Sequence, residues 1–347
     1  MTQSRDSLRG NTQTVLGLID PKELGPTSMH EHILCDIRPP DWRDKGDYGI
    51  ELTLANHWPI DYGEVDAPGN LVLDSVVVAT SELRKMRSEG GRTVVEVSCG
   101  GLTPDPDGLK RVAEASDVHI VMGCGHYVHE YQDAGIADRS IDDLAQEMID
   151  QIFVGAWGSE IRAGIIGEIG CQSPWTDQEK KVMAAAVEAM KATGAALCVH
   201  PGREADQPQE IADFVKARGG DMNRLIISHV DRTIFDETRM FRLADMGCVL
   251  EFDLFGMETS YYKWADIDMP NDGVRLKWLR KILDQGHKDQ LVIAQDICYR
   301  SRLSMFGGHG YGHIFRNVVP MMGKRGFSKT EIDQIIVGTP QRLLTFT

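Results

Sequence analysis

The chain has 347 residues, of which 42% are hydrophobic, 26% charged and 7% aromatic, and its formal charge at pH 7 is -15. This acidic balance argues against nucleic acid as a partner, because a phosphate backbone needs a cationic surface. No apolar signal segment begins the chain, no run approaches the roughly 18 apolar residues of a membrane span, and the 7 cysteines lack CxxC spacing. We therefore expect a cytoplasmic protein with reduced cysteines and no membrane partner.

The chain starts with an irregular segment, residues 1–25, which we expect to form a leader or hairpin with its turn at Asp20, Pro21 and Lys22. Eight short apolar runs then predict strands, near 26–32, 93–98, 119–124, 163–168, 196–200, 225–229, 248–252 and 291–296. Segments between them have helical periodicity, at 71–89, 141–157, 177–193, 209–216 and 273–285. Eight strands that alternate with helices predict an α/β fold, the (β/α)8 or TIM barrel.

One long insertion separates the first two predicted strands. Residues 33–70 are rich in Pro, Asp, Gly and Trp, and the segment is too short and too polar to hold a core of its own. We expect it to be a loop over the C-terminal face of the barrel. Since no linker or low-complexity stretch interrupts the pattern elsewhere, residues 1–347 are predicted to form a single domain.

A His-Glu-His motif ends the first predicted strand. Strand side chains alternate, so His30 and His32 point to one side and Glu31 to the other. Such a motif arises by chance in many proteins, but here four further polar residues end or follow other strands: Glu168, His200, His229 and Asp296. The C-termini of barrel strands converge on one face. The six side chains are therefore predicted to meet.

This set of side chains predicts a metal centre. Four neutral imidazoles packed together without a cation would leave acceptors unpaired, and a carboxylate at a buried strand end costs several kcal/mol unless it meets a cation or a donor. None of these strands contains Lys or Arg. Imidazole with carboxylate suits zinc, manganese, cobalt or iron. We predict two divalent metal ions, with zinc preferred and Glu168 able to bridge them.

Several motifs together resemble the phosphotriesterase-like family of the amidohydrolase superfamily, over nearly the whole chain. They are HEH at 30–32, RAGIIGE, the VH and SH strand ends, the Asp of the last strand and the closing VGTPQRLL. The best-known phosphotriesterases bridge their metals with a carboxylated lysine, where this chain has Glu168. That glutamate, IDMPNDGVR and FGGHGYGHIFRNVVPMMGKRGFS are similar to the branch of phosphotriesterase-related and resiniferatoxin-binding proteins.

The resemblance implies a distorted (β/α)8 barrel with a binuclear metal site at its C-terminal face, and a homodimer. It implies that His30, His32 and Asp296 bind one metal, that His200 and His229 bind the second, and that Glu168 bridges them. A hydroxide between the metals would attack the substrate. Asp296 would take its proton and pass it to the leaving group.

Substrate contacts are expected from the loops that follow the strands. Tyr127 is predicted to donate its phenol to the substrate oxygen or else to pack under its loop; related lactonases have a tyrosine in a similar place. Lys263, Arg300 and Arg302 are loop cations in an acidic protein; Lys263 and Arg300 are predicted to bind an anionic substrate group. His126 and His129 line the pocket or lie on the surface. Five aromatic residues form a lid or anchor loops: Trp58, Tyr261, Tyr262, Trp264 and Phe306.

The sequence thus predicts a metal-dependent hydrolase acting on a small molecule. Its main predicted reaction is cleavage of a carboxylic ester, namely a lactone, with weak phosphotriesterase activity. One alternative is an amidase acting on N-acyl amino acids or other anionic amides, which the basic loop residues favour. A second alternative is a small-molecule binding protein without chemistry, and the complete set of six metal-binding residues argues against it. The sequence leaves open which bond is cleaved.

Overall fold

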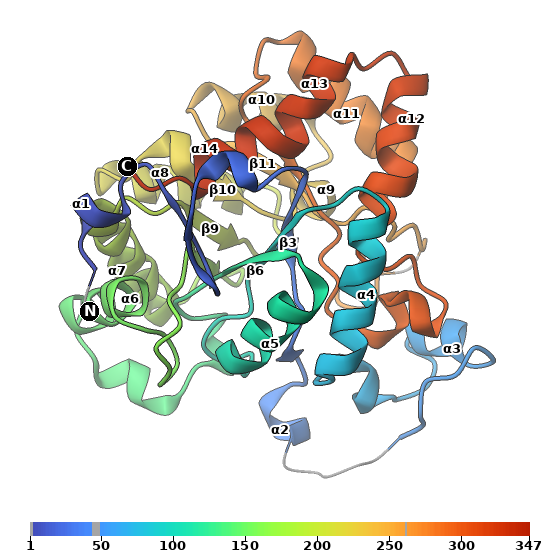
Figure 1. The fold of residues 1–347 in the computed structure, drawn as a ribbon, viewed down its shortest axis with the longest axis horizontal. Coiled ribbons are helices and arrows are strands. Elements are labelled where there is room, and N and C mark those ends of the chain that lie inside the picture. Colours follow the sequence, from blue (N-terminus) through green and yellow to red (C-terminus); the bar gives the residue numbers. More distant parts are fainter. Residues whose placement is uncertain (1–2, 44–48, 261) are drawn as a thin grey trace.

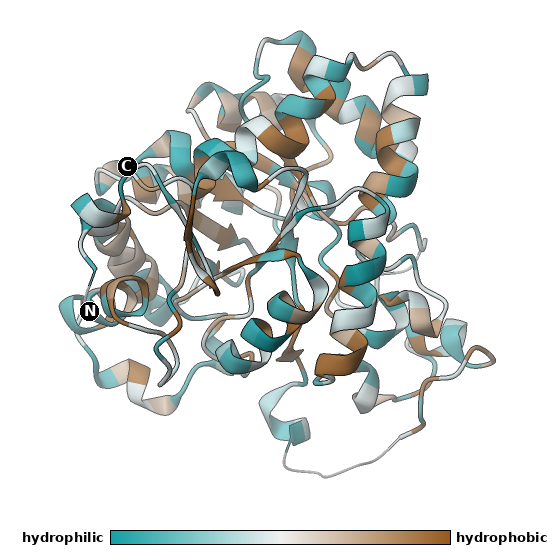
Figure 2. Cartoon of the chain, in the orientation of Figure 1, coloured by the Kyte–Doolittle hydropathy of each residue, from teal (hydrophilic) through white to brown (hydrophobic). Residues whose placement is uncertain are grey.

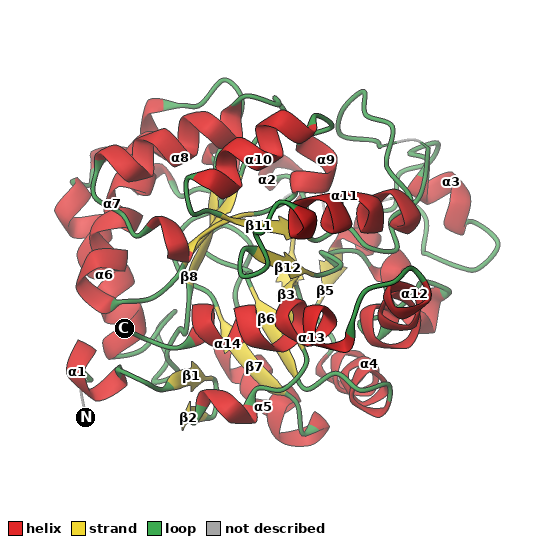
Figure 3. Cartoon of the chain, turned by 90° about the horizontal axis from the view of Figure 1, so that it is seen from above, coloured by secondary structure: helices red, strands yellow, loops and turns green. Residues whose placement is uncertain are grey.

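Eight parallel strands form the centre of the computed structural model, which describes residues 3–43, 49–260 and 262–347. They are β3 (Thr27–Glu31), β6 (Thr93–Glu96), β7 (His119–Met122), β8 (Ile166–Gly170), β9 (Leu197–His200), β10 (Leu225–Ile227), β11 (Val249–Phe252) and β12 (Leu291–Ile293). Each strand overlaps one of the eight predicted runs, so the predicted strands are confirmed. Viewed from above, helices surround these strands (Figure 3).

The strands pair in chain order, in one group that runs from β3 to β7 and a second that runs from β8 to β12. A few backbone hydrogen bonds join the two groups at each of two seams, β7 to β8 and β12 to β3, in place of a regular ladder. The Gly167 amide donates to the Cys124 carbonyl at 2.7 Å, and the Asp296 amide donates to the His30 carbonyl at 3.1 Å. The chain therefore forms the predicted barrel. The barrel is distorted because few backbone hydrogen bonds join its strands at these two seams.

Most of the helices that follow the strands begin with a side-chain cap. They are α4 (Val76–Ser88), α5 (Pro106–Ser116), α6 (Ile141–Phe153), α7 (Asp177–Thr193), α8 (Gln207–Ala217), α10 (Glu237–Asp245) and α11 (Asp272–Asp284). The hydroxyls of Ser75, Ser140 and Thr176 accept the amide N–H three residues on, which satisfies a donor that the helix leaves free. Helices α5 and α10 are additions to the predicted set. The capping Asp105 and the proline after it mark the start of α5.

Apolar residues fill both sides of the strands, which explains why the strands read as nearly continuous apolar runs. Val95, Val121 and Ile226 belong to a cluster inside the barrel, whereas Val94 and Ile120 pack outward against the helices. Figure 2 shows the hydrophobic colour along the central strands, with hydrophilic residues on the outer faces of several helices (Figure 2). Polar groups inside the barrel are therefore unusual and need partners.

The N-terminal segment forms the expected hairpin, but with a different turn. After the short helix α1 (Arg5–Leu8), β1 (Thr12–Thr14) pairs antiparallel with β2 (Gly17–Ile19), so the turn lies at residues 15–16. The predicted turn at Asp20 is wrong. Asp20 instead caps a 3-10 helix, η1 (Pro21–Glu23), because its carboxylate accepts the Lys22 amide.

The insertion between the first two barrel strands contains short elements. They are β4 (Cys35–Asp36), α2 (Pro40–Arg43), α3 (His57–Asp61) and η2 (Pro68–Leu71), and β4 pairs antiparallel with β5 (Val72–Leu73). Ile37 and Trp58 from this segment line two cavities described below. Figure 1 shows α2 and α3 beyond one end of the barrel. Residues 44–48 lie outside the described part.

The remaining elements are short. They are η3 (His129–Tyr131), η4 (Ala134–Asp138), η5 (Met222–Arg224), α9 (Val230–Thr233), η6 (Arg300–Arg302), η7 (Ser304–Phe306), η8 (Ile314–Val318), α12 (Val319–Lys324), α13 (Lys329–Asp333), η9 (Gln334–Gly338) and α14 (Thr339–Leu344). All 7 cysteines are buried free thiols, as predicted. Among the residues that the structure describes, no helix has the length and apolar character needed to cross a membrane.

Candidate metal centre and active site

The structure brings all six predicted metal-binding residues together at the C-terminal ends of the strands. His30 and Glu168 lie within β3 and β8, and His200 ends β9. The other three directly or closely follow strands: His32 follows β3, His229 follows β10 and Asp296 follows β12. The side chain of Asp296 is 17% exposed, whereas that of Glu168 is 2% exposed. The sequence therefore predicted correctly which residues meet.

The Glu168 carboxylate lies at the centre of this cluster. Its Oε1 is 3.4 Å from His32 Nε2, and its Oε2 is 2.8 Å from His200 Nδ1 and 3.4 Å from His229 Nε2. His30 Nε2 lies 3.5 Å from Oε2 on the other side. Glu168 belongs to two groups of possible ligand atoms, one with His30 and His32 and one with His200 and His229. A carboxylate that belongs to two groups of ligands can bridge two cations.

The cluster has an unsatisfied atom that a metal would satisfy. His30 Nε2 is buried without a hydrogen-bond partner in the described chain. An orphaned imidazole nitrogen is costly in an apolar interior, and it faces a carboxylate and other imidazoles, a donor set that transition metals prefer. Asp296 Oδ1 lies 3.3 Å from His32 Nε2, on the side of the first group. The residues present therefore fit two divalent cations.

Electrostatics in the cluster also favour bound cations. Burial opposes a charge on His32, but hydrogen bonds to Asp296 and Glu168 and their negative charges raise its pKa to about 10. Burial lowers the pKa of His200 to about 4, which keeps that imidazole neutral and able to bind metal. Burial also opposes the charge on Glu168, yet the charge of His30 and hydrogen bonds from His200 and His229 hold its pKa well below the usual value. The buried anion needs positive charge nearby.

The backbone holds two of these residues in a strained conformation. His229 has φ of 54° and Asp296 has φ of 48°, in the left-handed region that side chains with a Cβ rarely adopt. The His229 amide donates to Asp253 Oδ2 at 2.8 Å, and the Asp296 amide donates across the barrel seam to the His30 carbonyl. Such strain is concentrated at functional sites, where the surrounding structure stabilises it.

A second layer of side chains orients the imidazoles. Glu251 Oε2 lies 2.9 Å from His30 Nδ1, Asp253 Oδ1 lies 2.9 Å from His229 Nδ1, and Ser98 Oγ lies 2.8 Å from His32 Nδ1. Ser98 in turn donates to Glu96. The sequence analysis did not select these residues. Glu251 and Asp253 are two residues apart at the end of β11, the spacing that marked His30 and His32, so the same alternation would have identified them.

Loss of one second-layer carboxylate is expected to weaken metal binding without unfolding the protein. A carboxylate on the second imidazole nitrogen fixes the ring and its tautomer, and its removal typically costs 10- to 100-fold in metal affinity, roughly, in other proteins. We expect a loss of that order for Asp253→Asn, measured by titration against a competing chelator. Glu160→Gln, on the exposed surface, is the control. Equal affinity in both variants would show that Asp253 does not orient a ligand.

Glu31 has a structural role, as the alternation of side chains predicts. It is buried, and its carboxylate oxygens accept the amides of Gln295 at 3.0 Å and Ile297 at 2.9 Å. The carboxylate therefore ties β3 to the chain after β12, at one of the seams of the barrel. Burial raises the pKa of Glu31 to about 7.

A cavity of about 410 Å³ lies beside the cluster. We call it the metal cavity; His32, Glu168, His200 and Asp296 line it, together with Tyr127, Arg203, Arg232, Tyr262, Trp264 and Tyr299. Tyr127 therefore lies where the sequence analysis expects a substrate contact. Its hydroxyl is 3.5 Å from His200 Nε2, and burial raises the pKa of the phenol well above the usual value, so it remains a donor.

Arg300 does not reach the metal cavity, which corrects the predicted substrate contact. Its Nε donates to the Val72 carbonyl at 2.7 Å, and its Nη2 lies 3.1 Å from Asp74 Oδ1. The 3-10 helix Arg300–Arg302 turns the side chain toward the β5 strand instead of toward the cluster. The guanidinium stabilises the insertion, and it is not available to a substrate in the metal cavity.

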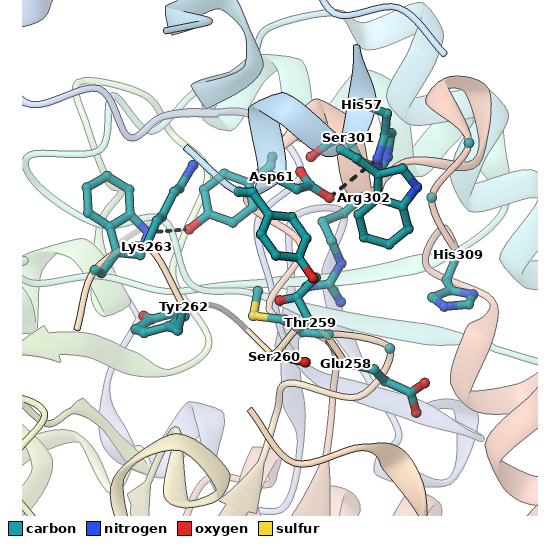
Figure 4. A pocket seen from close by; sticks show the side chains of 18 residues that line it. His57, Asp61, Glu258, Thr259, Ser260, Tyr262, Lys263, Ser301, Arg302 and His309 are labelled. Atoms are coloured by element: carbon teal, nitrogen blue, oxygen red, sulfur yellow. Dashed lines mark hydrogen bonds and ion pairs between the residues drawn. The ribbon is translucent and has the colours of Figure 1, made fainter. Parts of the chain in front are cut away.

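Lys263 and Arg302 line a neighbouring cavity of about 490 Å³, the side cavity (Figure 4). Lys263 Nζ lies over the rings of Tyr299, at 4.7 Å, and Trp264, at 5.1 Å from their centroids. Arg302 Nη2 donates to the carbonyls of Phe255 and Gln295. Tyr262, Trp264 and Tyr299 line both cavities, whereas Lys263 lines only the side cavity. The predicted contact between Lys263 and a substrate at the metals is therefore not found.

The other predicted loop residues are dispersed. Trp58 lines the side cavity, Tyr262 and Trp264 line both cavities, and Phe306 lines a smaller one. Tyr261 lies outside the described residues. The His126 ring is buried 3.3 Å from Glu147 Oε2, away from the metal cavity. His129 is exposed in the loop after β7, where its amide binds Glu179.

The sequence model of the phosphotriesterase family matches residues 10–344 of this chain. The chain belongs to the phosphotriesterase family. An N-acetyltaurine hydrolase of Salmo salar is 40% identical over 98% of this chain and 99% of its own. A phosphotriesterase-related protein of Nematostella vectensis is 38% identical over 97% of this chain and 99% of its own. The predicted family and branch are thus confirmed, and this phosphotriesterase family member is a hydrolase.

A solved structure shows the same fold. The resiniferatoxin-binding protein from Rhodobacter sphaeroides superposes with a TM-score of 0.91 at 28% identity, covering 99% of this chain and 97% of the other. Because the superposition covers nearly the whole chain, the barrel is the architecture of this phosphotriesterase family member.

Proposed function

We propose that this protein is a metal-dependent amidase that hydrolyses an N-acyl amide whose amine carries an anionic group, such as an N-acyl taurine. The observation that carries the proposal is the complete cluster around Glu168, in a chain 40% identical over almost its full length to an N-acetyltaurine hydrolase. These names support the alternative of the sequence analysis, an anionic amide, better than its main prediction, a lactone. The complete cluster argues against a binding protein without chemistry.

Two bound divalent cations would supply activated water at neutral pH and polarise the amide carbonyl. We propose that His30, His32 and Asp296 hold one cation, His200 and His229 the other, and Glu168 both. The partly exposed Asp296 carboxylate faces the metal cavity, where it can accept the proton of the attacking water and deliver it to the leaving nitrogen. The neutral Tyr127 phenol can donate to the substrate oxygen.

Three further features are proposed on the sequence and the family resemblance. Zinc is the preferred metal, with manganese, cobalt or iron as alternatives, because the ligands are imidazoles and carboxylates. A cytoplasmic location suits the 7 free buried thiols. A homodimer of single-domain chains is expected from the family resemblance. Metal analysis and light scattering of the purified protein would test the metal and the dimer.

The proposal is tested with one panel of substrates. The protein, reconstituted with zinc, is given N-acetyltaurine, N-acetyl-β-alanine, γ-butyrolactone and a phosphotriester, before and after exhaustive chelation. We expect the two anionic amides to be hydrolysed well above the others, with activity lost on chelation and restored by zinc. Faster turnover of the lactone would restore the main prediction of the sequence analysis, and activity that survives chelation would exclude a metal-dependent reaction.

A further inference from the structure

An arginine beside the cluster has a free positive charge. Arg203 follows β9 by three residues and lines the metal cavity with His200 and Tyr127. The guanidinium therefore shares this cavity with the His200 imidazole and the Tyr127 phenol.

No carboxylate among the described residues forms an ion pair with Arg203. Its side-chain hydrogen bond runs from Nη2 to the Tyr262 hydroxyl at 3.2 Å, and the guanidinium carbon lies 5.5 Å from the centre of that ring. The side chain is exposed in the loop after β9. In a chain of charge -15, a cation without an anionic partner at the edge of a catalytic cavity is unusual.

The other arginines near the cluster are already engaged. Arg232 is buried, and its Nη2 donates to the Pro201 carbonyl at 3.2 Å and lies 3.3 Å from His200 Nε2, so it holds the β9 loop in place. Arg300 is bound to Asp74 and Val72, and Arg302 faces the side cavity. Arg203 and Arg232 both line the metal cavity without a carboxylate partner among the described residues, but Arg232 is buried and donates to backbone carbonyls, whereas Arg203 is exposed and free to receive an anion.

We propose that Arg203, with the Tyr262 hydroxyl, binds the sulfonate or carboxylate of the leaving amine and so determines the preference for anionic amides. The inference rests on the proposed function and deepens it. Since the phenol oxygen of Tyr262 accepts from Arg203, its own O–H can donate to the same anion. In N-acetyltaurine two carbons separate nitrogen from sulfur, so the anion must be held within the metal cavity, which Arg203 lines.

Competing charges make this contact selective. Glu130 and Glu204 also line the metal cavity, and both repel an anion that enters without a cation to receive it. A planar guanidinium can donate two parallel hydrogen bonds to a sulfonate or carboxylate, whereas a lysine ammonium binds as a point charge. Arg203 is thus a specificity residue, and the chemical step depends on the metal-binding cluster and Asp296.

The test uses two amides of matched size, N-acetyltaurine and the neutral N-acetylethanolamine. For Arg203→Gln we expect KM for N-acetyltaurine to rise about 10- to 100-fold, since a hydrogen bond to a charged group is lost, with little change in kcat. The KM for N-acetylethanolamine should stay within about twofold, since that substrate has no charge to lose. Arg203→Lys should recover part of the loss, and Arg300→Gln serves as the control cation.

The outcomes separate this inference from the proposed function. Hydrolysis of both amides by the wild-type protein, with KM effects of Arg203→Gln that are equal for the two, would overturn the role of Arg203 and leave the amidase intact. If the wild type hydrolyses neither amide, the proposed function fails; taurine binding measured by calorimetry on wild type and Arg203→Gln then decides the anion site alone. Equal taurine affinity in the two proteins would overturn it.

Discussion

Glu168→Gln is expected to lose metal from both positions and to reduce hydrolysis to the background rate. The carboxylate is the one group common to the two sets of ligand atoms, with one oxygen 3.4 Å from His32 and the other 2.8 Å from His200. Glutamine has the same shape but no charge, and its amide nitrogen cannot bind a cation. The measurement is metal content by mass spectrometry after reconstitution and gel filtration.

One control variant and one further measurement make this result interpretable. Glu160→Gln removes a charge from the exposed surface and should keep full metal content. Thermal unfolding supplies a second readout, because a ligand that binds only the folded state stabilises it. We expect zinc to raise the Tm of the wild type and to leave the Tm of Glu168→Gln nearly unchanged. An unchanged metal content in Glu168→Gln would move this residue from the metal centre to a structural role.

The sequence predicted the barrel and its cluster because both depend on local signals. Strands buried on two faces give short apolar runs, and a charged or imidazole side chain at the end of such a run, like Glu168 or His229, has few explanations other than a site. The convergence of strand ends in a parallel barrel then places these residues together without any knowledge of the loops. Glu251 and Asp253 followed the same rule but were overlooked.

The loops could not be predicted in the same way, because the direction of a loop side chain is set by tertiary contacts. Arg300 lies four residues beyond Asp296, yet a turn of 3-10 helix directs it to Val72 and Asp74 of a segment more than two hundred residues away in sequence. Arg203 lies three residues beyond His200 and does line the metal cavity. Spacing alone does not distinguish these two arginines.

Asp296→Asn is expected to lower kcat on N-acetyltaurine by about 10²- to 10⁴-fold, the usual contribution of a positioned proton-transfer group. Its Oδ1 lies 3.3 Å from His32 Nε2, and its side chain is 17% exposed, more open to the metal cavity than Glu168. Asparagine keeps an oxygen that can bind metal but cannot accept the proton of the attacking water. Kinetics should therefore show a large loss in kcat while metal content, determined by mass spectrometry, stays near that of the wild type.

The leaving group separates proton transfer from metal binding as the role of Asp296. An amine must be protonated to leave, whereas the phenolate of p-nitrophenyl acetate leaves without a proton. If Asp296 both accepts and delivers the proton, Asp296→Asn should reduce amide hydrolysis more than hydrolysis of the activated ester. Equal losses on the two substrates, together with lost metal, would make Asp296 a ligand without a role in proton transfer. The comparison thus depends on the chemistry of the substrate and not on the stability of the variant.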